Sequence, residues 1–63
     1  MPLITIELAP GRTHAQKREF MQEVTTLAST ILKCPTETID IIFKEIPSSH
    51  WAHAGKFYAE PNE

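Results

Sequence analysis

The stretch MPLITIEL (residues 1–8) decides the fold of this chain. Ile4, Ile6 and Leu8 would share one face of an extended strand, while the residues between them would share the other. Pro2 suits the first residue of a strand, because proline has a fixed φ and no amide donor. The stretch therefore predicts a strand over residues 3–8, which ends at the breaker APG that follows it.

A helix is predicted to follow this strand. Thr13 and Gln16 stand three positions apart and match a capping box, in which each side chain bonds the other residue's amide. Pro35 ends the helix near Lys33 or Cys34. An apolar stripe is expected to face the sheet, made by Phe20, Val24, Leu27, Ala28, Ile31 and Leu32.

A second strand is predicted over residues 39–46. Its face at Ile39, Ile41 and Phe43 is wholly apolar and suits the helix, whereas the opposite face is mixed. Two strands joined by a long helical crossover run parallel, with a right-handed connection. We therefore expect an α/β fold, namely a β-α-β unit with a parallel two-stranded sheet, followed by a short carboxy-terminal hairpin within residues 53–58. Residues 1–63 form one domain on this interpretation, with a polar, frayed tail at 61–63.

The small size of the chain favours self-association. Sixty-three residues form one domain with a core that is marginal on its own. Small domains usually add disulfides, metals or oligomerisation, and the single cysteine, Cys34, cannot make an internal disulfide. Ile42 and Ile46 on the mixed strand face also need a cover. A homo-oligomer is therefore expected.

Charge and hydropathy exclude several classes of function. The net charge of −2 and the pI near 5.9 argue against nucleic-acid binding. No apolar run approaches the roughly 20 residues of a membrane span, so no membrane partner is expected. No signal-peptide pattern is present, and a lone thiol fits a reducing compartment, so we expect a cytoplasmic protein.

Pro2 is the first candidate for chemistry. If Met1 is removed, the Pro2 nitrogen becomes a secondary amine, whereas with Met1 retained it is a non-basic amide. An unperturbed α-amino group has a pKa of about 7.7–8.0, so a free Pro2 could act as a general base at neutral pH. The alternative is that Pro2 only begins the strand.

The order of these features resembles that of a known family. The chain opens with Met-Pro-Leu-Ile, continues with Pro-Gly-Arg-Thr at residues 10–13 and one amphipathic helix, and carries Trp51 shortly after the second strand. This resembles the 4-oxalocrotonate tautomerase family over the first 58 or so residues. The resemblance implies an isomerase that uses the amino-terminal proline as its base, needs no cofactor, and assembles as dimers that trimerise.

The resemblance also suggests two substrate-binding residues. Arg12 would clamp the carboxylate of a small unsaturated 2-oxo or 2-hydroxy acid and would meet the proline of a neighbouring subunit. Trp51 would form an apolar wall of the pocket. The alternatives are a solvated Arg12, as expected for Arg18, and a Trp51 that only packs in a core or an interface.

Asp40 departs from the family pattern, in which an arginine at this position polarises the substrate's keto oxygen. A carboxylate cannot do this unless it is protonated, so a dicarboxylate substrate should be handled poorly and an arylpyruvate enol becomes an alternative. Lys44, on the same strand face, could supply the missing charge or could simply be solvated. A catalytically weakened paralogue or a subunit of a heteromer is a further alternative. A haloacrylate dehalogenase is disfavoured, because His53 stands where that class has an acid.

The His50-x-x-His53 pair invites a metal hypothesis. The other histidine and the cysteine of the chain are His14 and Cys34. Zinc sites need three or four converging ligands, and the spacing of this pair occurs often by chance. No metal site is therefore predicted. A hydrogen bond from either His50 or His53 in the pocket is the other option.

Overall fold

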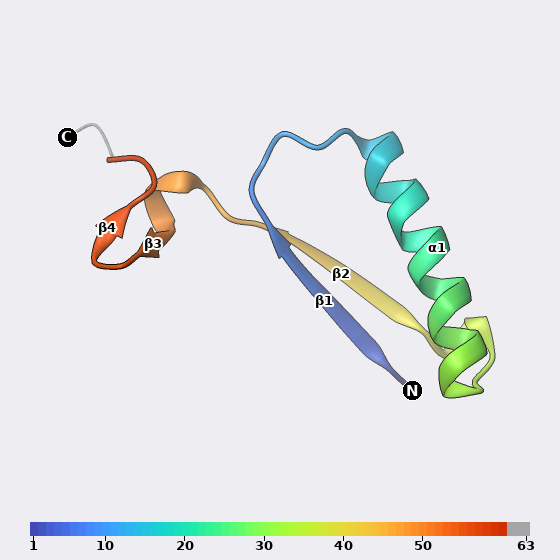
Figure 1. Cartoon of the computed structure of the whole chain (residues 1–63). Coiled ribbons are helices and arrows are strands. Elements are labelled where there is room, and N and C mark those ends of the chain that lie inside the picture. The colour runs from blue at the N-terminus through green and yellow to red at the C-terminus, as the bar shows by residue number, and fades with distance from the viewer. Residues whose placement is uncertain (61–63) are drawn as a thin grey trace.

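The computed structural model describes residues 1–60 as a β-α-β unit followed by a small hairpin (Figure 1). The predicted fold class is confirmed, and the polar tail expected at 61–63 lies outside the described residues. In chain order the elements are β1 (Leu3–Leu8), α1 (His14–Leu32), the 3-10 turn η1 (Thr36–Thr38), β2 (Asp40–Glu45), the 3-10 turn η2 (Ser48–His50), β3 (Ala52–His53) and β4 (Lys56–Phe57).

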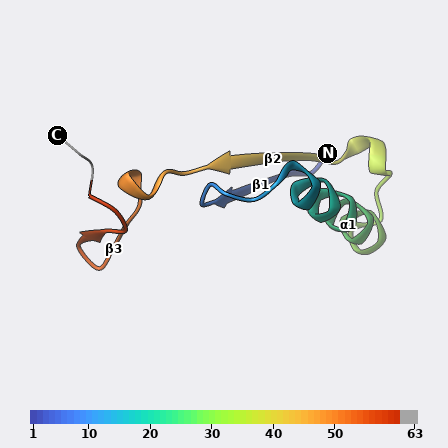
Figure 2. The ribbon, with the colours of Figure 1, turned by 90° about the horizontal axis from the view of Figure 1, so that it is seen from above.

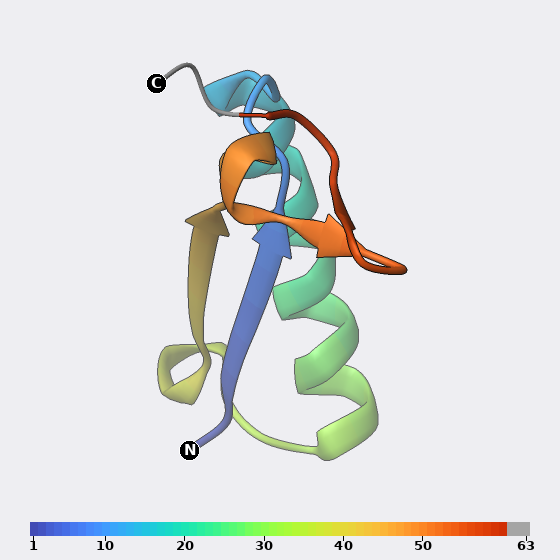
Figure 3. The same cartoon turned by 90° about the vertical axis from the view of Figure 1, so that its left-hand side faces the viewer.

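The sheet has the predicted parallel topology. β1 and β2 run side by side in the same direction, with Leu3 opposite Asp40 and Leu8 opposite Glu45 (Figure 3). Burial alternates along β1, and its half-buried residues lie on the face that α1 covers. On that face, Phe20 of α1 meets Phe43 of β2 edge-on, with ring centroids 6.4 Å apart. The period-two apolar pattern therefore sets which face receives the helix.

Both ends of α1 follow from the local sequence. The Thr13 hydroxyl accepts from the Gln16 amide (3.1 Å), and the Gln16 side chain accepts from the Thr13 amide (2.9 Å). At the other end Lys33 adopts a left-handed conformation (φ 56°), and its amide bonds the carbonyl of Ser29. Pro35 then prevents the helix from continuing. Within residues 1–60, neither α1 nor either 3-10 turn has the length and apolar character of a membrane span.

Removal of the capping hydroxyl should destabilise the fold. Thr13→Ala leaves the Gln16 amide without its acceptor, and we expect a loss of about 1 kcal/mol in the free energy of unfolding. Chemical denaturation at one fixed protein concentration measures this loss. Thr30→Ala is the matched control, because Thr30 lies exposed within the same helix and should change stability by less than about 0.5 kcal/mol. Equal effects of the two substitutions would contradict the capping role.

No side chain among residues 1–60 is fully buried. α1 lies on one side of a sheet of only two strands (Figure 2), and the half-buried residues in its middle are Met21, Val24, Thr25 and Ala28. The predicted stripe was therefore displaced: Val24 and Ala28 belong to the half-buried face, but so does Thr25, while Leu27 and Ile31 remain 59% and 65% exposed. On the opposite sheet face Leu3 and Ile42 are 60% and 44% exposed. These uncovered apolar side chains fit a chain that associates with other copies.

The carboxy-terminal arm, residues 47–60, extends past the end of the sheet that is opposite the amino terminus (Figure 1). β3 and β4 pair antiparallel around Ala54 and Gly55, and both residues have positive φ (53° and 81°). Two successive positive φ angles suit a two-residue hairpin. The hairpin is tied to η2 by the Ala59 amide, which donates to the Ser48 carbonyl (3.3 Å). The predicted hairpin is confirmed.

Candidate active site

Pro2 lies at the amino end of β1 and is half-buried. Its carbonyl accepts a hydrogen bond from the Asp40 amide at 3.1 Å, which anchors the start of β1 to the start of β2. Met1, which precedes it, is 96% exposed. The Met1–Pro2 peptide bond is therefore accessible to a processing enzyme, whereas the residue that processing would uncover is held in place.

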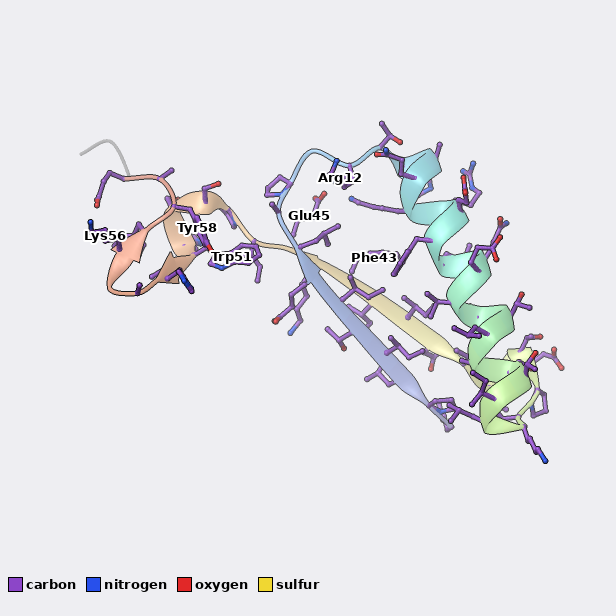
Figure 4. All side chains as sticks on the ribbon, in the orientation of Figure 1. Arg12, Phe43, Glu45, Trp51, Lys56 and Tyr58 are labelled. Atoms are coloured by element: carbon purple, nitrogen blue, oxygen red, sulfur yellow. The ribbon has the colours of Figure 1, made fainter. Side chains whose placement is uncertain are left out.

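Arg12 lies at the opposite end of β1, in the segment that leads to α1 (Figure 4). It lines a cavity of about 320 Å³ with Gln16, Lys17 and the apolar side chains Ile6, Leu8, Phe20 and Phe43. Lys17 is paired with Glu45 at 2.6 Å. No carboxylate of residues 1–60 lies within ion-pair distance of Arg12, so its guanidinium is available to an external anion.

Trp51 lies in the carboxy-terminal arm, at the same end of β1 as Arg12 (Figure 4). It is half-buried, and it borders two hollows, one with Glu7 and Ile46 and the other with Ala9 and Tyr58. The six residues of β1 span about 20 Å at 3.3 Å per residue. A single copy therefore brings Trp51 and Arg12 to one end of β1 and leaves Pro2 at the other.

Asp40, the residue that departs from the pattern implied by the resemblance, lies at the same end of the sheet as Pro2. Asp40 is exposed and opposite Leu3 in the register of the sheet. Lys44 shares its face, but four residues of β2 separate the two by about 13 Å. In the register Lys44 faces Glu7 instead. Within one chain, Lys44 therefore does not supply a cation next to Pro2.

The histidine pair does not assemble a metal site within residues 1–60, because no group of three or more His, Cys, Asp or Glu side chains converges there. His53 instead stacks on Tyr58, with ring centroids 6.3 Å apart and planes 19° from parallel. Its role in this structure is an aromatic contact within the arm.

Tyr58 is a further residue of this region that was not predicted as part of the site. It meets Trp51 edge-on at 5.5 Å between ring centroids, and its amide donates to the Trp51 carbonyl at 2.9 Å. The predicted hairpin was sufficient to find this pair, because a two-residue turn at residues 54–55 places positions 51 and 58 opposite each other. The register of the hairpin, rather than its presence alone, identifies this pair.

Comparison with known proteins decides the family. The family model described as "Tautomerase enzyme" matches residues 2–60. The chain belongs to the tautomerase family. A probable tautomerase of Ralstonia nicotianae is 38% identical over 55 residues, which cover 87% of this chain and 79% of that protein. A probable tautomerase of Listeria monocytogenes shows the same identity, with coverage of 87% and 90%.

Solved structures agree with this tautomerase assignment. The crystal structure of YwhB, a homologue of 4-oxalocrotonate tautomerase, superposes with a TM-score of 0.89 at 30% identity and covers 97% of this chain and all of that one. A heterohexamer 4-oxalocrotonate tautomerase from Chloroflexus aurantiacus matches with a TM-score of 0.86 at 29% identity, over 98% of this chain and all of that one. The predicted resemblance to the 4-oxalocrotonate tautomerase family is confirmed.

Proposed function

We propose that this tautomerase moves a proton between oxygen and carbon of a small unsaturated 2-hydroxy or 2-oxo acid, with Pro2 as the general base after removal of Met1. The nitrogen lone pair takes the proton of the 2-hydroxyl group, and the C2 carbonyl forms. The electrons of the former C2–C3 double bond then take the proton back at C3. The amine ends each cycle unchanged, so the reaction needs no cofactor.

One observation carries this proposal. In this member of the tautomerase family, Pro2 and Arg12 lie at opposite ends of β1, and the second edge of β1 is open. Among residues 1–60, β1 pairs only with β2. A two-fold axis that pairs β1 antiparallel with β1 of a second copy would bring Pro2 of one chain beside the Ala9–Arg12 segment of the other. Arg12 would then hold the substrate carboxylate, and Trp51 would wall the pocket.

Tautomerisation tests the proposal directly. The enol of an arylpyruvate and a 2-hydroxydienoate dicarboxylate both change ultraviolet absorbance as they ketonise. Protein with Met1 removed, as verified by its intact mass, should accelerate ketonisation of at least one of these substrates. If neither substrate ketonises faster in the presence of the protein, the proposed function is contradicted.

Asp40 should restrict which acids are turned over. Asp40→Arg replaces a carboxylate at the Pro2 end of the sheet by an electrophilic donor, and we expect kcat/KM for the dicarboxylate to rise by roughly tenfold. Asp40→Asn is the matched control, because it removes the negative charge without adding a cation, and it should give a smaller gain. If both substitutions lower the dicarboxylate rate below that of the unsubstituted chain, the prediction is wrong and the Asp40 carboxylate itself takes part in the reaction.

A second candidate function is that of one subunit in a heteromer. Two observations favour it: Asp40 removes a cation from the site, and one structural neighbour is a heterohexamer. A partner chain with an arginine at this position would restore the missing donor. Co-expression with such a chain and native mass spectrometry test this, because a mixed complex would support the heteromer and separate homomeric species would exclude it.

A further inference from the structure

The carboxy-terminal arm carries a small aromatic cluster, formed by Trp51, Tyr58 and His53. The Trp51 and Tyr58 rings are perpendicular (90°) at 5.5 Å, and His53 stacks on Tyr58. The amide of Tyr58 also bonds the carbonyl of Trp51, so both the backbone and the rings join the two residues. Tyr58 therefore fixes the position and the tilt of the Trp51 indole.

A hollow of about 320 Å³ lies against this cluster, lined by Ala9, Ser48, Trp51 and Tyr58. None of these side chains carries a formal charge, and two are aromatic, so the hollow suits an apolar, flat group rather than a second carboxylate. An apolar cavity of roughly 150 Å³ accommodates a benzene ring. The space is therefore sufficient for a phenyl substituent.

The hollow and the carboxylate clamp belong to the same chain and to the same end of β1. Ala9 lines the hollow, and Arg12 follows three residues later, so their Cα atoms lie within about 11 Å of each other. An acid with one carboxylate and one aryl group could engage both at once. A dicarboxylate would instead place its second charge against Trp51 and Tyr58, and none of the described residues that line the hollow is a cation.

We infer that Tyr58 is a positioning residue for Trp51, and that the hollow between them selects aryl monocarboxylates over dicarboxylates. This inference rests on the proposed function and names its substrate class. Tyr58 acts through Trp51 and through the shape of the hollow, and it takes no part in the proton transfer.

Binding of unreactive acids tests the inference without turnover. The chain has a single tryptophan, so its intrinsic fluorescence reports on Trp51 alone. Hydrocinnamate is the aryl monoacid probe, and adipate is a dicarboxylate of comparable length. We expect the processed protein to bind hydrocinnamate at least about tenfold more tightly than adipate. Equal affinities, or tighter binding of adipate, would overturn the inference.

Four variants distinguish a positioning role of Tyr58 from a general effect on the structure of the arm. Tyr58→Ala should weaken hydrocinnamate binding about fivefold and leave adipate unchanged, whereas Tyr58→Phe should keep the preference, because the ring remains. Phe57→Ala is the matched control for loss of an aromatic side chain at the adjacent position of the arm. Ala9→Leu fills the hollow without altering the cluster, so it should also weaken hydrocinnamate binding selectively, which covers the case in which Tyr58→Ala does not fold. An unchanged hydrocinnamate-to-adipate ratio in both Tyr58→Ala and Ala9→Leu would refute the inference.

Failure of the proposed function can be distinguished from failure of this inference by measuring turnover and binding in the same chain. A chain whose Pro2 nitrogen is acetylated should bind hydrocinnamate normally and turn over nothing. If that acetylated chain turns over substrate, the base assignment falls while the binding preference stands. If it is inactive and the preference is absent, the inference falls alone.

Discussion

A synthetic chain that begins at Pro2 is expected to ketonise an arylpyruvate enol at least about 10²-fold faster than a synthetic chain that retains Met1. The two molecules differ by one residue, which is 96% exposed and therefore contributes little to packing. They differ fundamentally at one nitrogen, which is a basic amine in the first and an amide in the second. The sequence has only 63 residues with Met1 included, so both chains are accessible to chemical synthesis and the comparison does not depend on processing in a host.

Two controls assign the difference to the lone pair. A chain that begins at Pro2 and is acetylated there should match the slow molecule, because acetylation converts the amine to an amide. A chain that begins with alanine should fall between them, since it keeps an amine of different geometry. Circular dichroism and sedimentation should be the same for all four chains. Equal activity in the Met1-bearing chain would remove Pro2 from the mechanism.

Mixing two inactive variants should restore activity, which is the second large effect. Arg12→Ala removes the carboxylate clamp, and we expect kcat/KM to fall by roughly 10²-fold. The Pro2-acetylated chain is inactive for a different reason. If Pro2 and Arg12 meet only across two copies, an equal mixture that is unfolded and refolded together should regain activity in roughly a quarter of its sites.

Arg18→Ala is the matched control for this experiment. Arg18 is an exposed arginine on α1, and it should leave both the rate and the complementation unchanged. Refolding each variant separately before mixing should give little recovery if the assemblies exchange slowly. A co-refolded mixture that stays inactive would show that one chain supplies both groups, contrary to the separation of about 20 Å along β1.

The elements of this fold could be predicted because local rules determine each of them. The alternation of Ile4, Ile6 and Leu8 fixed the inward face of β1, and the Thr13–Gln16 capping box fixed where α1 begins. β2 is one residue shorter at each end than predicted, because Ile39 ends the η1 turn and Ile46 leads out of the sheet. Pattern alone does not determine such boundaries.

The candidate site was harder to predict because much of it depends on contacts between segments. The stripe on α1 was predicted from periodicity, but the width that the sheet covers depends on the number of strands in the layer. Pro2, Arg12 and Trp51 were chosen by resemblance. The predicted strand over residues 3–8 already separates Pro2 from Arg12, but no pattern within the sequence places Trp51 at the Arg12 end of it. The Trp51–Tyr58 pair depends on the register of the hairpin, which follows from the turn at Ala54 and Gly55.

The partial exposure of every side chain in residues 1–60 bears on gene expression. If each reaction centre needs two copies, as proposed, an isolated nascent polypeptide is inert, and activity rises more steeply than in proportion to the amount made. At concentrations below the dissociation constant of the assembly, a doubling of the protein would therefore more than double the activity.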